Sequence, residues 1–240
     1  MTINGIDVQT AFGVKEWNIE PSYAAFSNKS EWIAGAVLPD LMKAETGLKT
    51  QKVKVMIKGR TREEMWDKAG QLISALLKPC IVQFRHFEDR YFKCVLVNAS
   101  HAEVSLRRFH TATLELTGYE YGIERSFTST DSTMKLYNIG SARTPCIISV
   151  TPSNALNSLN ITGVLRDPFK DTAETLTISN LRSGREIIID PFAGTVLEGS
   201  TNRFDDVSMN EWPSLIPGEN TITVNQSGVT LKVTFAPFYL

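Results

Sequence analysis

The chain has 240 residues, enough for one large domain or two small ones. Hydrophobic residues make up 42% and charged residues 21%, which is typical of a folded globular protein and argues against disorder. The formal net charge is -1, from 25 basic and 26 acidic side chains, so the chain lacks the cationic surplus of a nucleic-acid-binding domain. We find no run of about 18 apolar residues that would predict insertion into a membrane. The first five residues lack the basic and apolar regions of a signal peptide, so we expect synthesis in a cytoplasm.

The first half of the sequence predicts strands around one main helix. Residues Lys52–Lys58 alternate apolar and polar side chains, as a half-buried strand does. Thr61 and Glu64 form a T-x-x-E capping box, and Pro79 ends the helical pattern, which predicts a helix over Thr61–Lys78. Its apolar stripe predicts packing onto a sheet and consists of Met65, Ala69, Leu72, Ile73, Leu76 and Leu77.

Two antiparallel hairpins are predicted after this helix. Ile81–Phe87 and Tyr91–Val97 would form the first, and His101–Arg107 and Thr111–Thr117 the second, with Val104, Leu106, Leu114 and Leu116 facing inward. The fold class predicted for residues 1–125 is therefore α+β, with one main helix covering one face of mostly antiparallel sheets.

A polar segment rich in Ser and Thr, residues 126–133, is interpreted as a linker. Residues 134–240 then predict an all-β sandwich or jelly roll, since short strand patterns alternate with turn signals. The last two strand patterns, Thr221–Val224 and Val229–Phe235, flank a turn with Gly228 and predict a closing hairpin. The candidate strands before them are Met134–Ile139, Cys146–Val150, Leu159–Val164, Glu174–Leu181, Arg185–Asp190 and Thr195–Leu197.

The three cysteines, Cys80, Cys94 and Cys146, are an odd and sparse set that fits a reducing compartment. With a turn near Glu88–Asp89, Cys80 would lie opposite Val97 rather than Cys94, so no disulfide is expected. Free cysteines are commonly buried, and no C-x-x-C spacing indicates zinc. We therefore expect three buried thiols.

We find no motif for catalysis or for a cofactor, and predict no catalytic, cofactor-binding or metal site and no enzyme. Three weaker alternatives remain. His86 with Glu88 and Asp89 could hold a metal, although surface charges on a turn explain them better. The carboxylates Asp205, Asp206 and Glu211 near Trp212 could suggest a glycosidase. A basic stretch near Trp66 could contact nucleic acid, but lysines on the solvent face of a strand are the simpler account, and it contains Lys49, Lys52, Lys54, Lys58, Arg60 and Arg62.

The chain resembles the distal tail proteins of phages with flexible, non-contractile tails. In the first half, the capped helix is followed by Ile81–Phe84 and by Asp89–Leu96, similar to the family's helix and its D-R-x-Y hairpin, and Gly118–Tyr121 stands where the first domain closes. In the second half, Tyr137–Pro145 resembles the entry into the family's sandwich, and Ile178–Leu181 with Arg185–Asp190 its central hairpin. The W-P-x-L-x-P-G-x-N block completes the resemblance. The matching residues are Asn138, Gly140, Pro145, Trp212, Pro213, Leu215, Pro217, Gly218 and Asn220, and we expect them to serve the fold.

The resemblance implies a structural protein of the virion tail tip, made in the cytoplasm of a bacterial host. Family members form a hexameric ring from their first domains, and galectin-like second domains project outward. The ring joins the tail-tube protein to the baseplate, tail-tip or receptor-binding proteins and leaves a channel for DNA in transit. In this chain, the charged hairpin of the first domain is a candidate ring interface. It is formed by Phe87, Glu88, Asp89, Arg90 and Tyr91.

Two other functions stay open at this level. A carbohydrate-binding sandwich that recognises a host surface would expose Trp32, Phe204 or Trp212 along a groove. Another tail-tube or baseplate component would share the ring domain, but such proteins usually lack the second sandwich.

Overall fold

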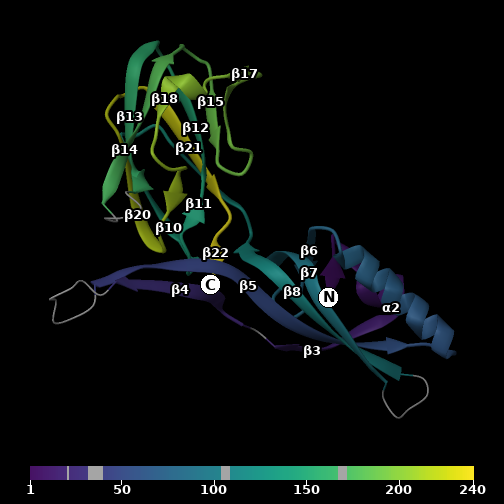
Figure 1. Cartoon of the computed structure of the whole chain (residues 1–240). Coiled ribbons are helices and arrows are strands. Elements are labelled where there is room, and N and C mark those ends of the chain that lie inside the picture. Colours follow the sequence, from purple (N-terminus) through teal and green to yellow (C-terminus); the bar gives the residue numbers. More distant parts are fainter. Residues whose placement is uncertain (21, 32–39, 104–108, 167–171) are drawn as a thin grey trace. The chain divides into compact units, whose positions relative to one another are not determined.

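The computed structural model describes residues 1–20, 22–31, 40–103, 109–166 and 172–240 (Figure 1). The chain divides into two compact units, residues 1–121 with Leu240 and residues 122–239. Among the described residues, no helix is long and apolar enough to cross a membrane. Both units are mostly β, with few helices, as the sequence predicts.

The first unit is built on one antiparallel sheet with the order β2-β1-β6-β7-β8-β5-β3, in which β4 also pairs with β5. Its strands are β1 (Thr2–Ile3), β2 (Ile6–Asp7), β3 (Val14–Glu20), β4 (Ala24–Glu31), β5 (Asp40–Lys58), β6 (Cys80–Gln83), β7 (Arg90–Glu103) and β8 (Phe109–Gly122). The predicted strand at Lys52–Lys58 is the last part of β5.

Helix α2 (Arg62–Leu76) confirms the predicted helix, although it ends two residues earlier than expected. Thr61 is the N-cap, and its hydroxyl accepts a hydrogen bond from Glu64 N at 3.2 Å. The Glu64 carboxylate accepts from Arg60 N at 2.7 Å, which satisfies a second backbone donor at the helix start. The buried face shares one core with the inward side chains of β5, and it consists of Met65, Ala69, Leu72 and Leu76. Leu77, expected in this stripe, is exposed after the helix ends.

A short helix, α1 (Val8–Phe12), was not predicted from the sequence. Asp7 caps it by accepting hydrogen bonds from Gln9 N and Thr10 N. Gly13 ends it in the left-handed region, with φ of 64°, which glycine adopts at no steric cost. An Asp followed six residues later by Gly was the available signal, but one and a half turns carry too little periodicity to be recognised.

Strand β8 has an uninterrupted alternation of buried and half-buried residues along its whole length. It pairs with β5 from Lys49↔Gly118 to Lys58↔Phe109. The expected inward positions Leu114 and Leu116 are fully buried. Because successive side chains point to opposite faces, this alternation places one row in the core and the other on the outer face of the sheet.

The two predicted hairpins share a strand, because the second arm of the first and the start of the first arm of the second form one strand, β7. Strand β7 continues past Val97 to Glu103, so His101 belongs to β7 rather than to a new strand. The segment with Val104 and Leu106 lies outside the described residues. Strand β6 ends at Gln83, and a six-residue loop separates it from Arg90. The hairpin is centred at Phe87 rather than between Glu88 and Asp89 as we predicted, so the register differs, and Cys80 lies opposite Cys94, not Val97.

The second unit is a sandwich of two antiparallel sheets (Figure 1). One sheet has the order β10-β20-β13-β14-β18, with β10 (Thr133–Asn138), β13 (Leu156–Arg166), β14 (Ala173–Leu181), β18 (Val207–Ser208) and β20 (Gly218–Val224). The other has the order β17-β16-β15-β12-β21-β9, with β9 (Arg125–Ser129), β12 (Ile147–Pro152), β15 (Ile187–Asp190), β16 (Thr195–Glu198), β17 (Thr201–Asn202) and β21 (Val229–Phe235).

The remaining elements of this unit are small. They are the paired strands β11 (Thr144–Pro145) and β19 (Ser214–Leu215), the 3-10 helix η1 (Phe204–Asp206) and β22 (Phe238–Tyr239). Side chains of both sheets form one continuous core. It includes Ile161 and Ile178 from one sheet and Ile148, Ile189 and Val233 from the other.

Two predicted hairpins of the second unit are wrong. Strand β20 pairs with β10 and β13, whereas β21 pairs with β12 and β9, so the turn at Gly228 carries the chain from one sheet to the other. Likewise β14 pairs with β13 and β18, whereas β15 pairs with β12 and β16. Strands that face the same core from opposite sheets have the same alternation as hairpin arms, so the pattern alone cannot separate the two arrangements.

The segment interpreted as a linker, residues 126–133, is largely a strand. Strand β9 pairs with β21 over Arg125–Ser129 at the edge of the sheet. Phe127 stacks on Phe235 with 6.0 Å between ring centroids and covers the core. The Ser and Thr side chains around it suit an edge strand because an edge is kept polar.

Candidate functional site

The candidate interface hairpin, Phe87–Tyr91, comprises the end of the loop between β6 and β7 and the first two residues of β7. Two backbone hydrogen bonds shape this loop, from Phe87 N to Phe84 O at 3.1 Å and from Arg90 N to Phe87 O at 3.2 Å. The Gln83 side chain donates to Glu88 O at 2.7 Å and holds the far side. The loop is therefore fixed by local bonds.

The hairpin presents three of its residues to solvent and anchors two. Phe87 is 41% exposed, and Glu88 and Asp89 beside it are also exposed. The guanidinium of Arg90 lies 5.8 Å from the Phe87 ring centroid, within cation–π range. Tyr91 is half-buried and stacks on Tyr121 at 5.5 Å. The exposed tip thus stands on a rigid aromatic and cationic base.

A buried carboxylate ties this base to the sheet. Glu120 on β8 receives Arg90 Nη1 at 3.0 Å on one oxygen and Lys49 Nζ at 2.5 Å on the other. Lys49 and Glu120 are both buried, which means that neither charge is solvated except by its partners. Burial also raises the pKa of Tyr121, the stacking partner of Tyr91.

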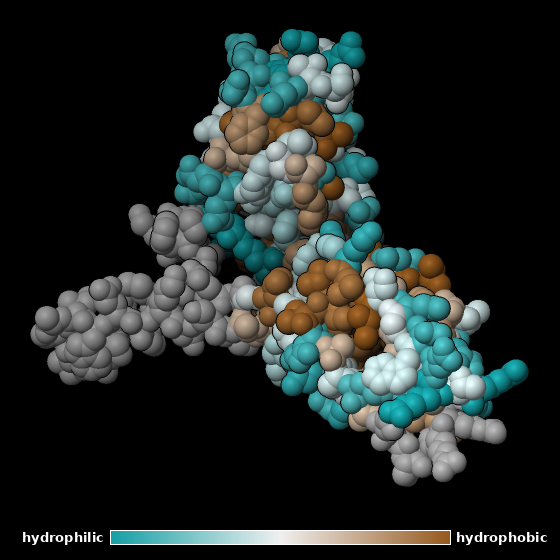
Figure 2. Space-filling model, turned by 45° about the vertical axis from the view of Figure 1, so that its right-hand side comes forward, coloured by the Kyte–Doolittle hydropathy of each residue, from teal (hydrophilic) through white to brown (hydrophobic). Residues whose placement is uncertain are grey.

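Large apolar side chains reach the surface of the first unit at several further points. On the face that Figure 2 shows, apolar side chains gather among polar ones. The exposed set in this unit consists of Ile6, Tyr23, Leu48, Trp66, Leu77, Ile81, Phe87, Val95 and Val97. Ile81, Val95 and Val97 alternate with the buried residues of β6 and β7, so they lie on the outer face of the sheet.

The family-signature residues meet in two local networks of the second unit. Asn220 clamps the turn before β20, because its side chain accepts from Ile216 N at 3.0 Å and donates to Ile216 O at 2.8 Å and to Gly218 O at 3.0 Å. Gly218 has φ of 90°, a conformation that favours glycine. Pro217 beside it is exposed.

Asn138 forms the second network. It is buried, donates to the Thr144 hydroxyl at 3.1 Å and accepts from Gly140 N at 3.0 Å. A Cβ on Gly140 would lie 2.4 Å from the backbone oxygen of Phe238, closer than real atoms approach. Gly140 therefore permits two backbone segments to touch.

The W-P-x-L part of the block connects to the same region. Pro145 pairs with Ser214 in β11 and β19, and Cys146 N donates to Pro213 O at 3.0 Å. Leu215 is fully buried, whereas Trp212 is half-buried against the core.

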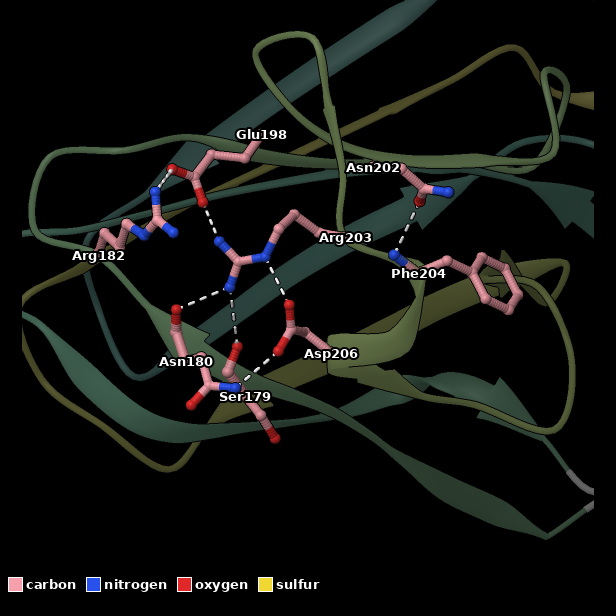
Figure 3. A network of polar contacts seen from close by, with 8 residues as sticks. All are labelled: Ser179, Asn180, Arg182, Glu198, Asn202, Arg203, Phe204 and Asp206. Atoms are coloured by element: carbon pink, nitrogen blue, oxygen red, sulfur yellow. Dashed lines mark hydrogen bonds and ion pairs between the residues drawn. The ribbon is translucent and has the colours of Figure 1, made fainter.

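The structure also shows a buried arginine that sequence reasoning missed (Figure 3). The Arg203 side chain is 7% exposed and forms an ion pair with Glu198, another with Asp206 at 2.6 Å and a hydrogen bond to Asn180 O at 2.8 Å. The exposed Arg182 reaches the second oxygen of Glu198 at 3.6 Å. No local pattern marks this arginine as buried: Asp206 lies three residues along the chain, but Glu198 and Asn180 come from β16 and β14.

Asp206 is bound on both sides within this network. Its hydrogen bond from the Asn180 amide at 2.7 Å and its bond from Arg203 hold the pKa of the carboxyl below its usual value. Glu211, the other acid considered for glycoside hydrolysis, pairs with Arg143 at 2.8 Å. Both carboxylates thus have cationic partners, and the lowered pKa of Asp206 is the opposite of what the general acid of this chemistry needs.

The other weak alternatives gain little from the geometry. Among the residues that the structure describes, no group of three or more His, Cys, Asp or Glu side chains could hold a metal ion. In the basic stretch, Lys54 pairs with Glu20 at 2.6 Å and Lys52 with Glu115 at 3.7 Å. For the carbohydrate alternative, Phe204 is exposed beside the half-buried Trp212, with 6.0 Å between ring centroids, and Trp32 lies outside the described residues.

Comparison with known proteins identifies the second unit and the fold of the whole. Residues 139–239 match the family model described as siphovirus-type tail component, C-terminal domain. A solved structure of the SPP1 Dit protein (gp 19.1), titled as a paradigm of the hub adsorption apparatus in Gram-positive infecting phages, is similar with a TM-score of 0.78. At 15% identity the alignment covers 99% of this chain and 98% of that one.

Two structures of the phage P2 baseplate in its activated conformation, with Ca and with Sr, match with 10% identity over 92% of this chain and 90% of that one. Their TM-score of 0.43 is too low to indicate a shared fold. The curated protein sequences contain no match. The resemblance to distal tail proteins is confirmed: residues 139–239 match the family model for the C-terminal domain of siphovirus-type tail components, and the whole chain has the fold of the SPP1 Dit protein.

Proposed function

We propose that this protein is a structural hub of a phage tail tip, without catalytic activity. Copies of the first unit would form a hexameric ring, and the second units would project outward as a galectin-like domain. The ring would join the tail-tube protein to baseplate or receptor-binding proteins and leave a channel for DNA. The protein would be made in the bacterial cytoplasm and carried in the virion.

The observation that carries this proposal is a fold match over 99% of the chain to a protein described as a hub, together with the family match in residues 139–239. The composition agrees, because a net charge of -1 suits a channel through which DNA passes without being retained.

The candidate interface hairpin would supply a contact between neighbouring copies. A ring is made by heterologous contacts, in which one surface of a copy meets a different surface of the next. An exposed aromatic residue on a rigid base suits such a contact because little conformational entropy is lost on binding. Phe87 at 41% exposure has this setting, and Arg90 and Tyr91 beneath it are held by Glu120 and Tyr121.

The test is the mass and shape of the purified full-length protein. Light scattering after size exclusion should give about six times the 26.7 kDa chain, and electron microscopy should show rings with a central hole. If purified tails are used instead, the ring should lie between tube and tip. Intact tails in which this protein is present as isolated single copies would refute the proposal.

The interface assignment is tested separately by two matched phenylalanines. Phe87→Asp should prevent or weaken ring formation by placing a charge in the contact. Phe192→Asp is the control, because Phe192 is 54% exposed on a turn of the second unit. Equal assembly of both variants, with unchanged thermal melting, would exclude the hairpin as an interface and leave the ring itself untouched.

Carbohydrate binding by the second unit is a second candidate, favoured by the exposed Phe204 ring next to Trp212. Aromatic faces of this kind can stack on sugar rings. A glycan array should detect binding that Phe204→Ser abolishes. An array without signal, read with the intact protein, counts against this candidate.

A further inference from the structure

The corrected register of β6 and β7 brings two cysteines together in the first unit. Cys80 and Cys94 are directly opposed partners of an antiparallel pair. Both are free thiols, and they are 2% and 3% exposed. Opposed residues in such a pair have Cα atoms about 4.5–5.5 Å apart. A disulfide needs about 4.4–6.8 Å, so these backbones could accept one without moving.

The two side chains already interact. The Cys80 thiol donates a hydrogen bond to the backbone oxygen of Cys94 at 3.7 Å, and the neighbouring Cys94 thiol lowers the pKa of Cys80. Cys80 is thus the readier nucleophile of the two. Cys146 differs, because it belongs to the second unit and burial raises the pKa of its thiol.

We propose that Cys80 and Cys94 are a disulfide-forming pair that stays reduced in a cytoplasm and closes when the protein meets a low-molecular-weight disulfide outside it. The Cys80 thiolate attacks one sulfur of the small disulfide, which forms a mixed disulfide and releases one small thiolate. The Cys94 thiolate then attacks the Cys80 sulfur and releases the second. The protein loses two protons and two electrons, and the small disulfide is reduced to two thiols.

The bridge would act on the loop that carries the candidate interface hairpin. That loop begins after Gln83 at the end of β6 and ends at Arg90 at the start of β7. A disulfide between Cys80 and Cys94 would therefore enclose the whole loop, with Phe87 and its neighbours, in one covalently closed segment. Such a closure restricts the unfolded chain and stabilises the folded one. Because both sulfurs are buried, exchange has to wait for a local opening of the four-residue strand β6. The chemistry does not depend on ring formation.

The experiment uses the folded full-length protein, equilibrated with oxidised glutathione, then denatured and alkylated with iodoacetamide. We expect one alkylated cysteine, Cys146, in place of three in the reduced sample, and a linked peptide pair that contains Cys80 and Cys94. The oxidised protein should also melt at a higher temperature than the reduced one. Reduction with dithiothreitol should restore the original melt.

The variants Cys80→Ala and Cys94→Ala should each leave all remaining cysteines available to alkylation, and Cys146→Ala should still form the bridge. The wild-type peptide map decides the question even if a core variant fails to fold. Three alkylated cysteines after prolonged equilibration, or a bridge that includes Cys146, would overturn the proposal. A bridge that forms only in denaturant would do so as well, because the proposal requires the folded register.

Discussion

Replacing Arg203 with methionine should destabilise the second unit more than any surface change near it. The substitution keeps a long apolar stem but removes the guanidinium that serves two carboxylates and two backbone oxygens. Glu198, 9% exposed, would then stay buried with only Arg182 at 3.6 Å as a partner. An uncompensated buried charge is costly because water cannot replace the lost partner.

The magnitude follows from the burial of both partners. Removing one member of a buried ion pair costs about 3–5 kcal/mol. For a unit of this size, that corresponds to a fall in Tm of roughly 10–25 °C. Arg182→Met is the matched control, since it contacts the same carboxylate from a side chain that is 72% exposed. An exposed pair of this kind contributes about 0–1 kcal/mol.

Calorimetry of the full-length protein, with hydrogen exchange of peptides from β14–β16, locates the loss in the second unit. Adding Glu198→Gln to Arg203→Met should recover part of the stability, since it removes the unpaired charge. If Arg203→Met and Arg182→Met lower Tm by the same small amount, the reasoning from burial is wrong.

Three further predictions concern the same unit. Gly140→Ala should lower the free energy of unfolding by about 1–3 kcal/mol, because the new Cβ would meet the Phe238 backbone oxygen. Gly70→Ala, on an open face of α2, is the control and should raise the Tm of the first unit. Trp212→Ala should cost about 1–3 kcal/mol by thermal melting, less than the roughly 3–5 kcal/mol of a fully buried ring, and an unchanged melt would contradict its packing on the core. The lowered pKa of Asp206 gives stability that is present above the ordinary carboxyl pKa of about 3.9 and is lost as pH falls through the lowered value. Titrating Tm from about pH 5 to pH 2 should therefore show a shallower acid loss in Asp206→Asn than in the wild type, and parallel curves would refute the linkage.

Local chemistry made part of the fold predictable from sequence. Thr61 and Glu64 specify the start of α2 by bonds that close within one turn, and the inward rows of β5 and β8 follow from strict alternation. Which strands pair is a property of distant segments. For that reason β20 and β21 carried a hairpin pattern although each belongs to a different sheet.

The candidate site was predictable to a similar depth. A hairpin was predicted here, but Phe87 lies in the loop and Arg90 and Tyr91 are already in β7. The opposition of Cys80 and Cys94 depended on where that loop is centred, which the sequence left open. Arg203 gave no signal, because its partners Glu198 and Asn180 are neighbours only in the folded unit. Polar networks across strands are set by register, which a single sequence constrains weakly.

The unbroken alternation of β8 has a consequence for how such chains diverge. Inserting or deleting one residue inside this strand would exchange its two faces beyond that point, sending Leu114 or Leu116 outward and threonines into the core. A change of two residues would restore the phase. Descendants of this sequence should therefore vary in length at the ends of the strand, or by even steps within it.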